Sequence, residues 1–146
     1  MFTYSKLAQA GIAAVSYLAS IASEGRLAGS AEVAEARELS QKLIAKVLTI
    51  LSRAGIVEGT PGPSGGYRLK RPPSQITLLD IVRVFDRVDE LVMCPFGPHW
   101  CGSGDPCPLH HSIISLHEEV IGRLSAENFQ QFAAVTAARK PKVGGG

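Results

Sequence analysis

Hydrophobic positions recur at helical spacing in the first third of this 146-residue chain. Apolar residues at intervals of three and four predict a first helix over residues 7–22. A second, short helix is predicted over residues 31–36, with Ser30 as its N-cap. Ser40 is the expected N-cap of a third helix. Its apolar stripe stops before Gly55, a residue suited to the left-handed conformation that often ends a helix.

The pattern then changes from helical to extended and back. Residues 56–58 and 67–70 read as two short strands, and the Gly- and Pro-rich segment between them reads as a turn. A fourth helix over residues 77–88 begins in the style of a capping box. Residues 94–108 hold four Pro, three Gly and three Cys, a composition that excludes a regular element. Apolar residues over 109–135 predict one long amphipathic helix.

Three short helices followed by a hairpin describe a winged helix-turn-helix. The predicted fold class is mainly α with a small β-hairpin. We expect a winged helix-turn-helix DNA-binding domain over residues 1–90, a cysteine-rich loop over 91–108, a dimerisation helix over 109–138 and a flexible tail over 139–146. One small domain cannot bury the whole apolar stripe of the long helix, so we expect a homodimer. Packing of that helix against the chain's own first helix is the alternative, and both can hold.

Composition narrows the class of protein. Hydrophobic residues make up 45% and charged residues 19% of the chain, which excludes global disorder. The sequence has no Cys-x-x-Cys motif, no phosphate-binding loop followed by Lys-Ser/Thr and no recognisable Ser/His/Asp arrangement, so we do not expect an enzyme. The apolar run over 7–22 is short and interrupted by polar residues. We interpret it as part of the fold of a cytoplasmic protein that does not enter a membrane.

The positive charge is concentrated in one part of the sequence. Residues 37–71 contain seven Lys or Arg and two Glu, a net charge of +5, whereas the rest of the chain carries −3. The basic residues lie on the predicted third helix and hairpin, where a winged helix contacts phosphates. A solvated polar face is the simpler interpretation of such a helix taken alone. The helix order, the Gly-rich turn and the charge segregation together favour DNA.

The residue types in this basic segment suit contact with a duplex. Small and polar side chains can enter the major groove, where Gln and Lys bond to base edges. Glycines in the turn would let backbone N–H groups approach phosphates, and an arginine would add charge. The candidate DNA contacts are Ser40, Gln41, Lys42, Ala45, Lys46, Thr49 and Arg53 in the helix, and Gly65, Gly66 and Arg68 in the hairpin.

Two stretches carry a resemblance to a known family. Residues 40–57 read SQKLIAKVLTILSRAGIV, and residues 61–69 read PGPSGGYRL. This pattern resembles the IscR/NsrR-type family of bacterial winged-helix transcription regulators, and the likeness extends through residues 76–81 into the cysteine loop. The family's wing motif adds Pro61, Ser64 and Tyr67 to the candidate DNA contacts. Pro61 stands where the family usually has an arginine that can enter the minor groove, so this position concerns DNA sequence preference.

The cysteine loop has the chemistry of a metal site. Cys94, Cys101, Cys107 and His110 supply three thiolates and an imidazole within seventeen residues. Such donors bind iron–sulfur clusters, and they also form a closed tetrahedral set for zinc. The cysteines are separated by six and five residues, which is longer than the roughly two to four residues between the cysteines of a usual zinc knuckle. The resemblance implies an iron–sulfur sensor with these three cysteines as ligands.

The fourth ligand decides the type of cluster. A His three residues after the last Cys is typical of the IscR branch, which favours His110 and a [2Fe-2S] cluster, with [4Fe-4S] possible. His111 and His99 are the fallback ligands. The NsrR branch instead uses an Asp from the first helix, and residues 6–9 read KLAQ with no carboxylate. The sequence thus predicts a homodimeric transcription regulator of a palindromic double-stranded DNA operator, modulated by an iron–sulfur cluster. The alternative is a DNA-binding regulator with structural zinc or no metal.

Overall fold

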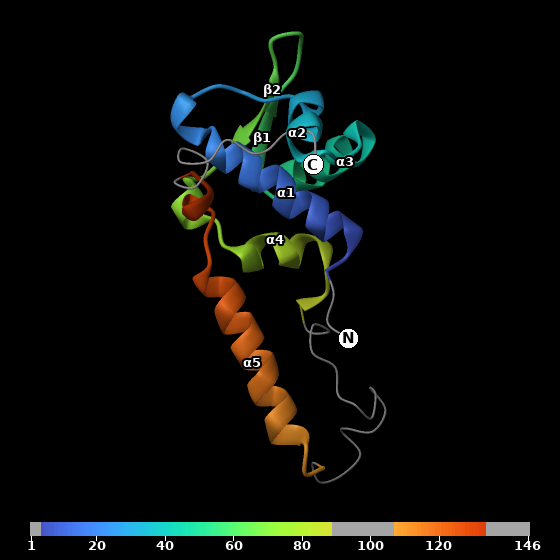
Figure 1. The fold of residues 1–146 in the computed structure, drawn as a ribbon, viewed down its shortest axis with the longest axis vertical. Coiled ribbons are helices and arrows are strands. Elements are labelled where there is room, and N and C mark those ends of the chain that lie inside the picture. The colour runs from blue at the N-terminus through green and yellow to red at the C-terminus, as the bar shows by residue number, and fades with distance from the viewer. Residues whose placement is uncertain (1–3, 89–106, 134–146) are drawn as a thin grey trace.

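A computed structural model describes residues 4–88 and 107–133 of the chain. Figure 1 shows a head of packed helices with a hairpin at one end. A long helix extends from the opposite side of this head. The helices and strands are α1 (Lys6–Ser20), α2 (Ser30–Arg37), α3 (Gln41–Arg53), β1 (Val57–Thr60), β2 (Gly66–Leu69), α4 (Leu78–Phe85) and α5 (His110–Ala126), with 3₁₀ turns at Ala22–Glu24 and Pro73–Gln75. The mainly helical fold with a two-stranded hairpin confirms the predicted fold class.

Helix α1 forms the centre of the head. It begins after Ser5, whose hydroxyl accepts a hydrogen bond from the Ala8 N–H at 3.0 Å. Helices α2, α3 and α4 all contact it, and its buried residues are mostly small. A Cβ added at Gly11 would lie 2.4 Å from the Phe85 ring of α4, so these two helices cross at the glycine. The apolar run over 7–22 is therefore a core helix of this fold.

Helices α2 and α3 form the predicted helix-turn-helix. Helix α2 starts one residue earlier than expected, because Gly29 rather than Ser30 occupies the N-cap position. Its end is sharp: Glu38 takes a left-handed conformation with φ 55°, and the Leu39 N–H donates to the Ala34 carbonyl at 3.0 Å. Ser40 caps α3 as predicted, since its hydroxyl accepts from the Leu43 N–H.

The hairpin is a two-stranded antiparallel sheet in which Val57 pairs with Leu69 and Thr60 with Gly66. Gly55, with φ 78°, turns the chain from α3 into β1, as the sequence indicates. Ala28 extends the ladder on the other side of β2. Its N–H donates to the Tyr67 carbonyl at 3.0 Å, and the Tyr67 N–H donates back at 2.8 Å. These bonds fasten the hairpin to the loop before α2.

Helix α4 begins with the predicted capping box. The Asp80 N–H donates to the Thr77 hydroxyl, and the Thr77 N–H donates to the Asp80 carboxylate. The helix ends at Phe85, earlier than the predicted residue 88. Leu79 and Val82 of α4 form a small second cluster with Leu124 of α5.

The prediction of one unbroken helix over 109–135 is wrong. Helix α5 stops at Ala126, because Glu127 is extended and its carbonyl accepts from the Leu78 N–H at 2.8 Å. After this break the Phe129 N–H bonds to the Pro73 and Ile76 carbonyls, and the Phe129 side chain is only 1% exposed. Phe129 and Phe132 thus belong to the head core rather than to the stripe of α5. The predicted helix is therefore interrupted at residues 127–129, and the helical residues 130–133 that follow pack on the head.

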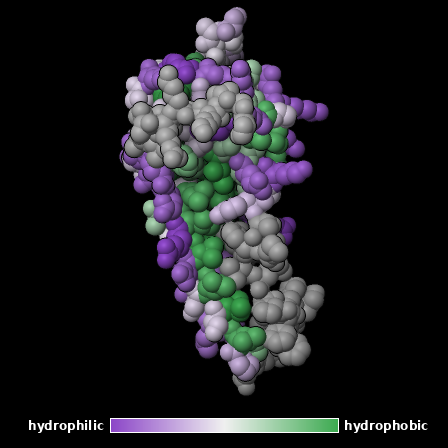
Figure 2. All heavy atoms as spheres, in the orientation of Figure 1, coloured by the Kyte–Doolittle hydropathy of each residue, from purple (hydrophilic) through white to green (hydrophobic). Residues whose placement is uncertain are grey.

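Helix α5 itself keeps much of its apolar surface in solvent. Leu109, Ile114 and Leu116 are 45%, 44% and 48% exposed. Figure 2 shows hydrophobic residues running along this helix below the head. Among the residues that the structure describes, no helix is both long and apolar enough to cross a membrane.

Candidate nucleic-acid interface

The polar face of α3 is open to solvent along the whole helix. Its apolar face, which includes Ile44 and Leu48, is fully buried against the core. The exposed residues are Ser40, Gln41, Lys42, Lys46, Thr49 and Arg53, with Ala45 half-buried among them. The Thr49 hydroxyl donates to the Ala45 carbonyl at 2.9 Å, so its lone pairs remain available to an outside donor. All seven predicted helix contacts therefore lie on the side of α3 away from the core.

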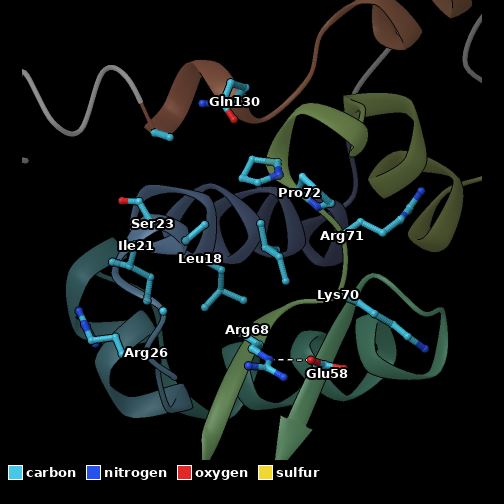
Figure 3. A pocket seen from close by; sticks show the side chains of 15 residues that line it. Leu18, Ile21, Ser23, Arg26, Glu58, Arg68, Lys70, Arg71, Pro72 and Gln130 are labelled. Carbon is cyan, nitrogen blue, oxygen red and sulfur yellow. Dashed lines mark hydrogen bonds and ion pairs between the residues drawn. The ribbon is translucent and has the colours of Figure 1, made fainter.

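The hairpin presents the second group of predicted contacts. Pro61 and Ser64 are exposed near its tip, which is the most remote part of the head from α5 in Figure 1. Arg68 on β2 is also exposed, and its Nε lies 2.6 Å from Oε1 of Glu58 on the neighbouring strand. Figure 3 shows this pair at the base of the hairpin, facing α1. Glu58 offsets part of the charge that the sequence assigns to Arg68.

Gly65, Gly66 and Tyr67 have structural roles in the hairpin that the sequence did not reveal. A Cβ at Gly65 would lie 2.0 Å from the Thr60 carbonyl oxygen, and one at Gly66 would lie 2.8 Å from the backbone of Ala28. The Gly65 N–H already donates to the Gly62 carbonyl at 3.0 Å. Tyr67 is half-buried and covers Gly59. The glycines thus shape the hairpin itself, and their approach to phosphates stays a prediction.

Arg37 was counted with the basic segment, but the structure uses it inside the head. Its Nε donates to the Ala13 carbonyl at 3.3 Å and to the Ser16 hydroxyl at 3.2 Å. The guanidinium also lies 5.3 Å from the centre of the Tyr17 ring. Burial lowers the pKa of Arg37 from its ordinary value. Arg37 therefore joins α2 to α1, and the charge offered to DNA is correspondingly smaller than the sequence count.

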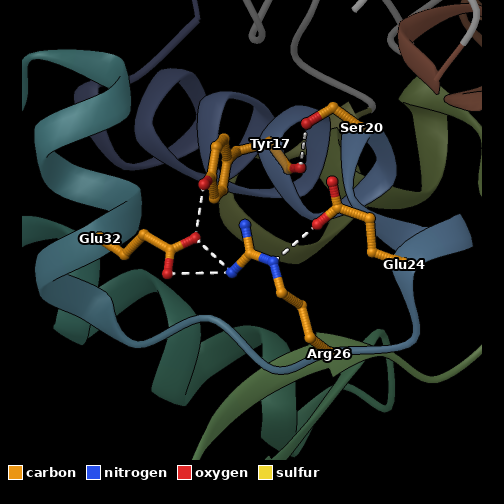
Figure 4. Close-up of polar contacts among 5 residues, drawn as sticks. All are labelled: Tyr17, Ser20, Glu24, Arg26 and Glu32. Carbon is orange, nitrogen blue, oxygen red and sulfur yellow. Dashed lines mark hydrogen bonds and ion pairs between the residues drawn. The ribbon is translucent and has the colours of Figure 1, made fainter. Parts of the chain in front are cut away.

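A polar cluster fixes the loop between α1 and α2 (Figure 4). Arg26 bonds through Nη1 to both carboxylate oxygens of Glu32, at 3.0 and 2.8 Å, and through Nε to Glu24 at 2.6 Å. The Tyr17 hydroxyl donates to Glu32 as well. Burial alone would raise the pKa of Glu32, but the hydrogen bonds from Tyr17 and Arg26 outweigh it and lower that pKa. The cluster holds the start of α2, and so the helix-turn-helix, against α1.

The structure describes two of the four predicted metal ligands. Cys94 and Cys101 lie outside the described residues, as does the fallback ligand His99. Cys107 and His110 lie one turn apart at the start of α5, where the His110 N–H donates to the Cys107 carbonyl at 3.0 Å. The second fallback ligand, His111, is exposed beside His110, with 5.4 Å between the ring centres. Within the described ranges no three potential metal ligands come together.

His117 is a further polar group on this helix. It follows His110 by seven residues and therefore lies on nearly the same face of α5. Its Nδ1 is buried and has no hydrogen-bond partner among the described residues. Buried polar atoms almost always have a hydrogen-bond partner, so we expect this nitrogen to bind a hydrogen-bond donor or a ligand. Nothing in the sequence distinguished this histidine from a solvated one.

Comparison with known proteins identifies the family. Residues 4–134 match the Rrf2 family, which is described as an iron-dependent transcriptional regulator. The chain belongs to the Rrf2 family. It is also 31% identical, over 119 residues, to an HTH-type transcriptional regulator of Aquifex aeolicus, covering 80% of this chain and 81% of that protein. The matched family and this relative are transcription regulators and not enzymes.

Two solved Rrf2-type structures share the fold. CymR, the global cysteine regulator of B. subtilis, has a TM-score of 0.75 and 24% identity, covering 93% of this chain and 99% of CymR. IscR of T. potens has a TM-score of 0.73 and 22% identity, covering 99% of this chain and 93% of IscR. At these identities the likeness establishes the winged-helix architecture. The chain is therefore an Rrf2-family DNA-binding transcription regulator.

Proposed function

We propose that this Rrf2-family regulator binds a palindromic double-stranded operator as a homodimer, and that an iron–sulfur cluster modulates the binding. The observation that carries the proposal is the exposed polar face of α3 beside a projecting hairpin. Lys42, Lys46 and Arg53 are exposed on that face, and the described residues give none of them an ion-pair partner. Such cations are free to neutralise phosphates, while Gln41 can reach a base edge.

The exposed face of α5 supports the homodimer. Leu109 and Leu116 are seven residues apart and so lie on one side of the helix, and both are nearly half exposed. A second copy of α5 packed on this side would cover both leucines. Two-fold symmetry would then present two copies of α3 to two half-sites, which is why a palindromic operator follows from a dimer.

The donor set at the start of α5 supports the cluster. Cys94, Cys101, Cys107 and His110 would hold it, and these are the ligand types that bind iron–sulfur clusters. No side chain caps the start of α5 and no acidic residue lies in its first turn. The positive end of the helix dipole therefore favours a nearby anionic thiolate group. Because thiolates need a reducing compartment, the proposal includes a cytoplasmic location.

The architecture gives such a site a route to the head. Helix α5 has 17 residues, so its two ends are about 26 Å apart. Cys107 and His110 lie at one end, and the other end is held by Leu124 and by the Glu127 carbonyl. A change at the ligand end would alter how two copies of α5 pack, and hence the spacing of the two heads. For regulation, the ligand states must differ in their coupling to DNA by about 1–3 kcal/mol.

The second candidate is a DNA-binding regulator with a structural zinc ion in the same place. Three thiolates and one imidazole form a closed tetrahedral set, which is the observation that favours it. A zinc site would stabilise the start of α5 without responding to redox conditions or iron supply. CymR is a global cysteine regulator, and the likeness to CymR therefore favours neither of these candidates as the source of the signal.

Anaerobic purification followed by iron, sulfide and zinc analysis tests the two candidates. We expect a coloured protein with iron and acid-labile sulfide in equal amounts and little zinc. The variants Cys107→Ser and His110→Ala should lose or shift the cluster absorption, whereas Ser112→Ala on the same helix serves as the matched control. A colourless protein with stoichiometric zinc would establish the second candidate. Loss of the cluster in His111→Ala or His117→Ala but not in His110→Ala would reassign the fourth ligand.

A further inference from the structure

A cavity of about 580 Å³ lies on the side of the head between α1, the end of β2 and the helical residues 130–133 (Figure 3). Its volume is within the usual range of small-molecule sites. The lining is apolar toward the head, where it includes Leu18 of α1, Ile21 directly after that helix, Leu69 of β2, and Pro72 and Pro73. Among the residues that the structure describes, the lining includes neither the exposed residues of α3 nor Cys107 or His110.

The charged residues around this cavity are mostly cations. Arg26, Arg68, Lys70 and Arg71 line it together with a single carboxylate, Glu58. Arg26 is already engaged by Glu24 and Glu32. Figure 3 shows the side chains of Lys70 and Arg71 extending away from α1, so they raise the local potential rather than contact an occupant.

Arg68 is the cation suited to hold a ligand. Only its Nε is used by Glu58, and both Nη groups are without a partner among the described residues. A guanidinium with two such free donors bonds readily to a carboxylate. The cavity therefore joins an apolar floor to one available anion-binding group.

We propose that this cavity binds a small organic carboxylate, with its hydrocarbon part on the Leu18 and Ile21 floor and its carboxylate on Arg68. The apolar floor disfavours inorganic phosphate and a DNA backbone, which have no hydrocarbon to bury. The four cations disfavour an organic amine. This site does not include Cys107 or His110 and would give the regulator a second input.

A consequence for DNA binding rests on the proposed function. Arg68 is also a predicted DNA contact on the hairpin, so a carboxylate held by Arg68 would compete with phosphate for the same donors. The two ligands must then weaken each other by the same factor. The binding of the carboxylate itself does not depend on DNA, so failure of this coupling and failure of the site are separate results.

The test is a titration of the full-length protein with hexanoate, followed by the backbone amide shifts in NMR spectra. We expect saturable shifts grouped at Ser23, Gly25, Lys70 and Arg71, with none grouped on α5. Hexylammonium and inorganic phosphate, at the same concentration and ionic strength, should produce no such group. Shifts spread over α5, or equal shifts with hexylammonium, would overturn the proposal, as would equal shifts with phosphate.

Two variants fix the location. Ala22→Phe fills the cavity from an exposed position without changing any charge, and should weaken hexanoate binding by about tenfold or more while leaving DNA affinity unchanged. Ala54→Phe, at an exposed alanine away from the cavity, is the matched control and should bind normally. Arg68→Gln should weaken hexanoate binding by a similar factor. Unchanged hexanoate binding in both Ala22→Phe and Arg68→Gln would contradict the site, and the same spectra show that each variant is folded.

Discussion

The head and helix α5 satisfy their apolar residues in different ways. In the head, Val15, Ile44, Val57 and Ile81 are essentially inaccessible to solvent, and the exposed surface of α3 is polar. In α5 only Leu124 is buried, and Leu116 remains 48% exposed. One chain can therefore complete the core of the head, whereas the exposed apolar residues of α5 would be covered in the proposed dimer. The proposal therefore assigns folding to the head and assembly to α5.

The strongest test of this division is at Phe129, which anchors the segment after α5 in the head core. Phe129→Ala should lower the free energy of unfolding by about 3–5 kcal/mol, because a fully buried aromatic side chain is replaced by a cavity. Denaturant unfolding measures the change. Phe132→Ala, at a half-buried ring stacked on Phe129, should cost less than half as much. Equal small effects in both variants would place Phe129 outside the core.

Assembly is tested on the exposed face of α5. Leu116→Glu should raise the dimer dissociation constant by about 100-fold, because a charge would be buried in the proposed interface. Sedimentation at several protein concentrations measures it, and circular dichroism should show an unchanged head. Ser125→Glu lies nine residues further along, on the opposite side of the helix, and should stay dimeric. A Leu116→Glu protein as dimeric as the parent would contradict this role of α5.

Two cations within the head should behave in opposite ways. Arg37→Ala removes the bonds to Ala13 and Ser16 and should cost about 1–3 kcal/mol of stability, with no change in the salt dependence of DNA binding. Lys46→Ala should leave stability unchanged, weaken DNA binding by about 1 kcal/mol and reduce the log–log salt slope by about 0.9. Thermal unfolding and titrations at several salt concentrations measure both. A lower salt slope for Arg37→Ala would show instead that Arg37 contacts DNA phosphates.

The smallest expected effect is the pH dependence at Glu32. Its pKa is lowered in the folded protein, so its contribution to stability is present above its ordinary pKa of 4.5 and is lost as pH falls through the lower folded value. The contribution is less than about 1 kcal/mol because the side chains of the ion pair are 44% and 40% exposed and solvent screens them. Glu32→Gln should flatten that part of a plot of stability against pH, and Glu35→Gln on the same helix should not. If the plot of stability against pH kept its slope in Glu32→Gln, another residue would be responsible for the loss of stability in acid.

Local rules were sufficient to predict most of the head from sequence. The Ser40 cap, the Thr77 capping box and the hairpin turn all depend on residues close together in the chain, and all are confirmed. The break of the C-terminal helix was missed because it depends on distant partners: the Glu127 carbonyl bonds to Leu78, and Phe129 fills the core. A helical period cannot show that the C-terminal part of the pattern packs against a different surface.

The candidate site shows the same limit. The exposed face of α3 follows from helical periodicity, but the use of Arg37 inside the head and the close contact of Gly66 with Ala28 depend on tertiary packing. The cavity at Arg68 joins α1, β2 and the helical residues 130–133, which are far apart in sequence. Charge and motif therefore indicated the DNA surface, whereas the packing that shapes it required the structure.

The central claim is that the ligand end of α5 controls a DNA-binding head. The most direct measurement is the affinity for genomic DNA fragments selected by the anaerobically purified protein, compared before and after removal of its metal at one salt concentration. The account predicts tight binding that changes by about 5–150-fold between the two forms. Equal affinities would contradict control by the metal site, and no selective binding in either form would contradict the assignment of α3 and the hairpin as the DNA-binding surface.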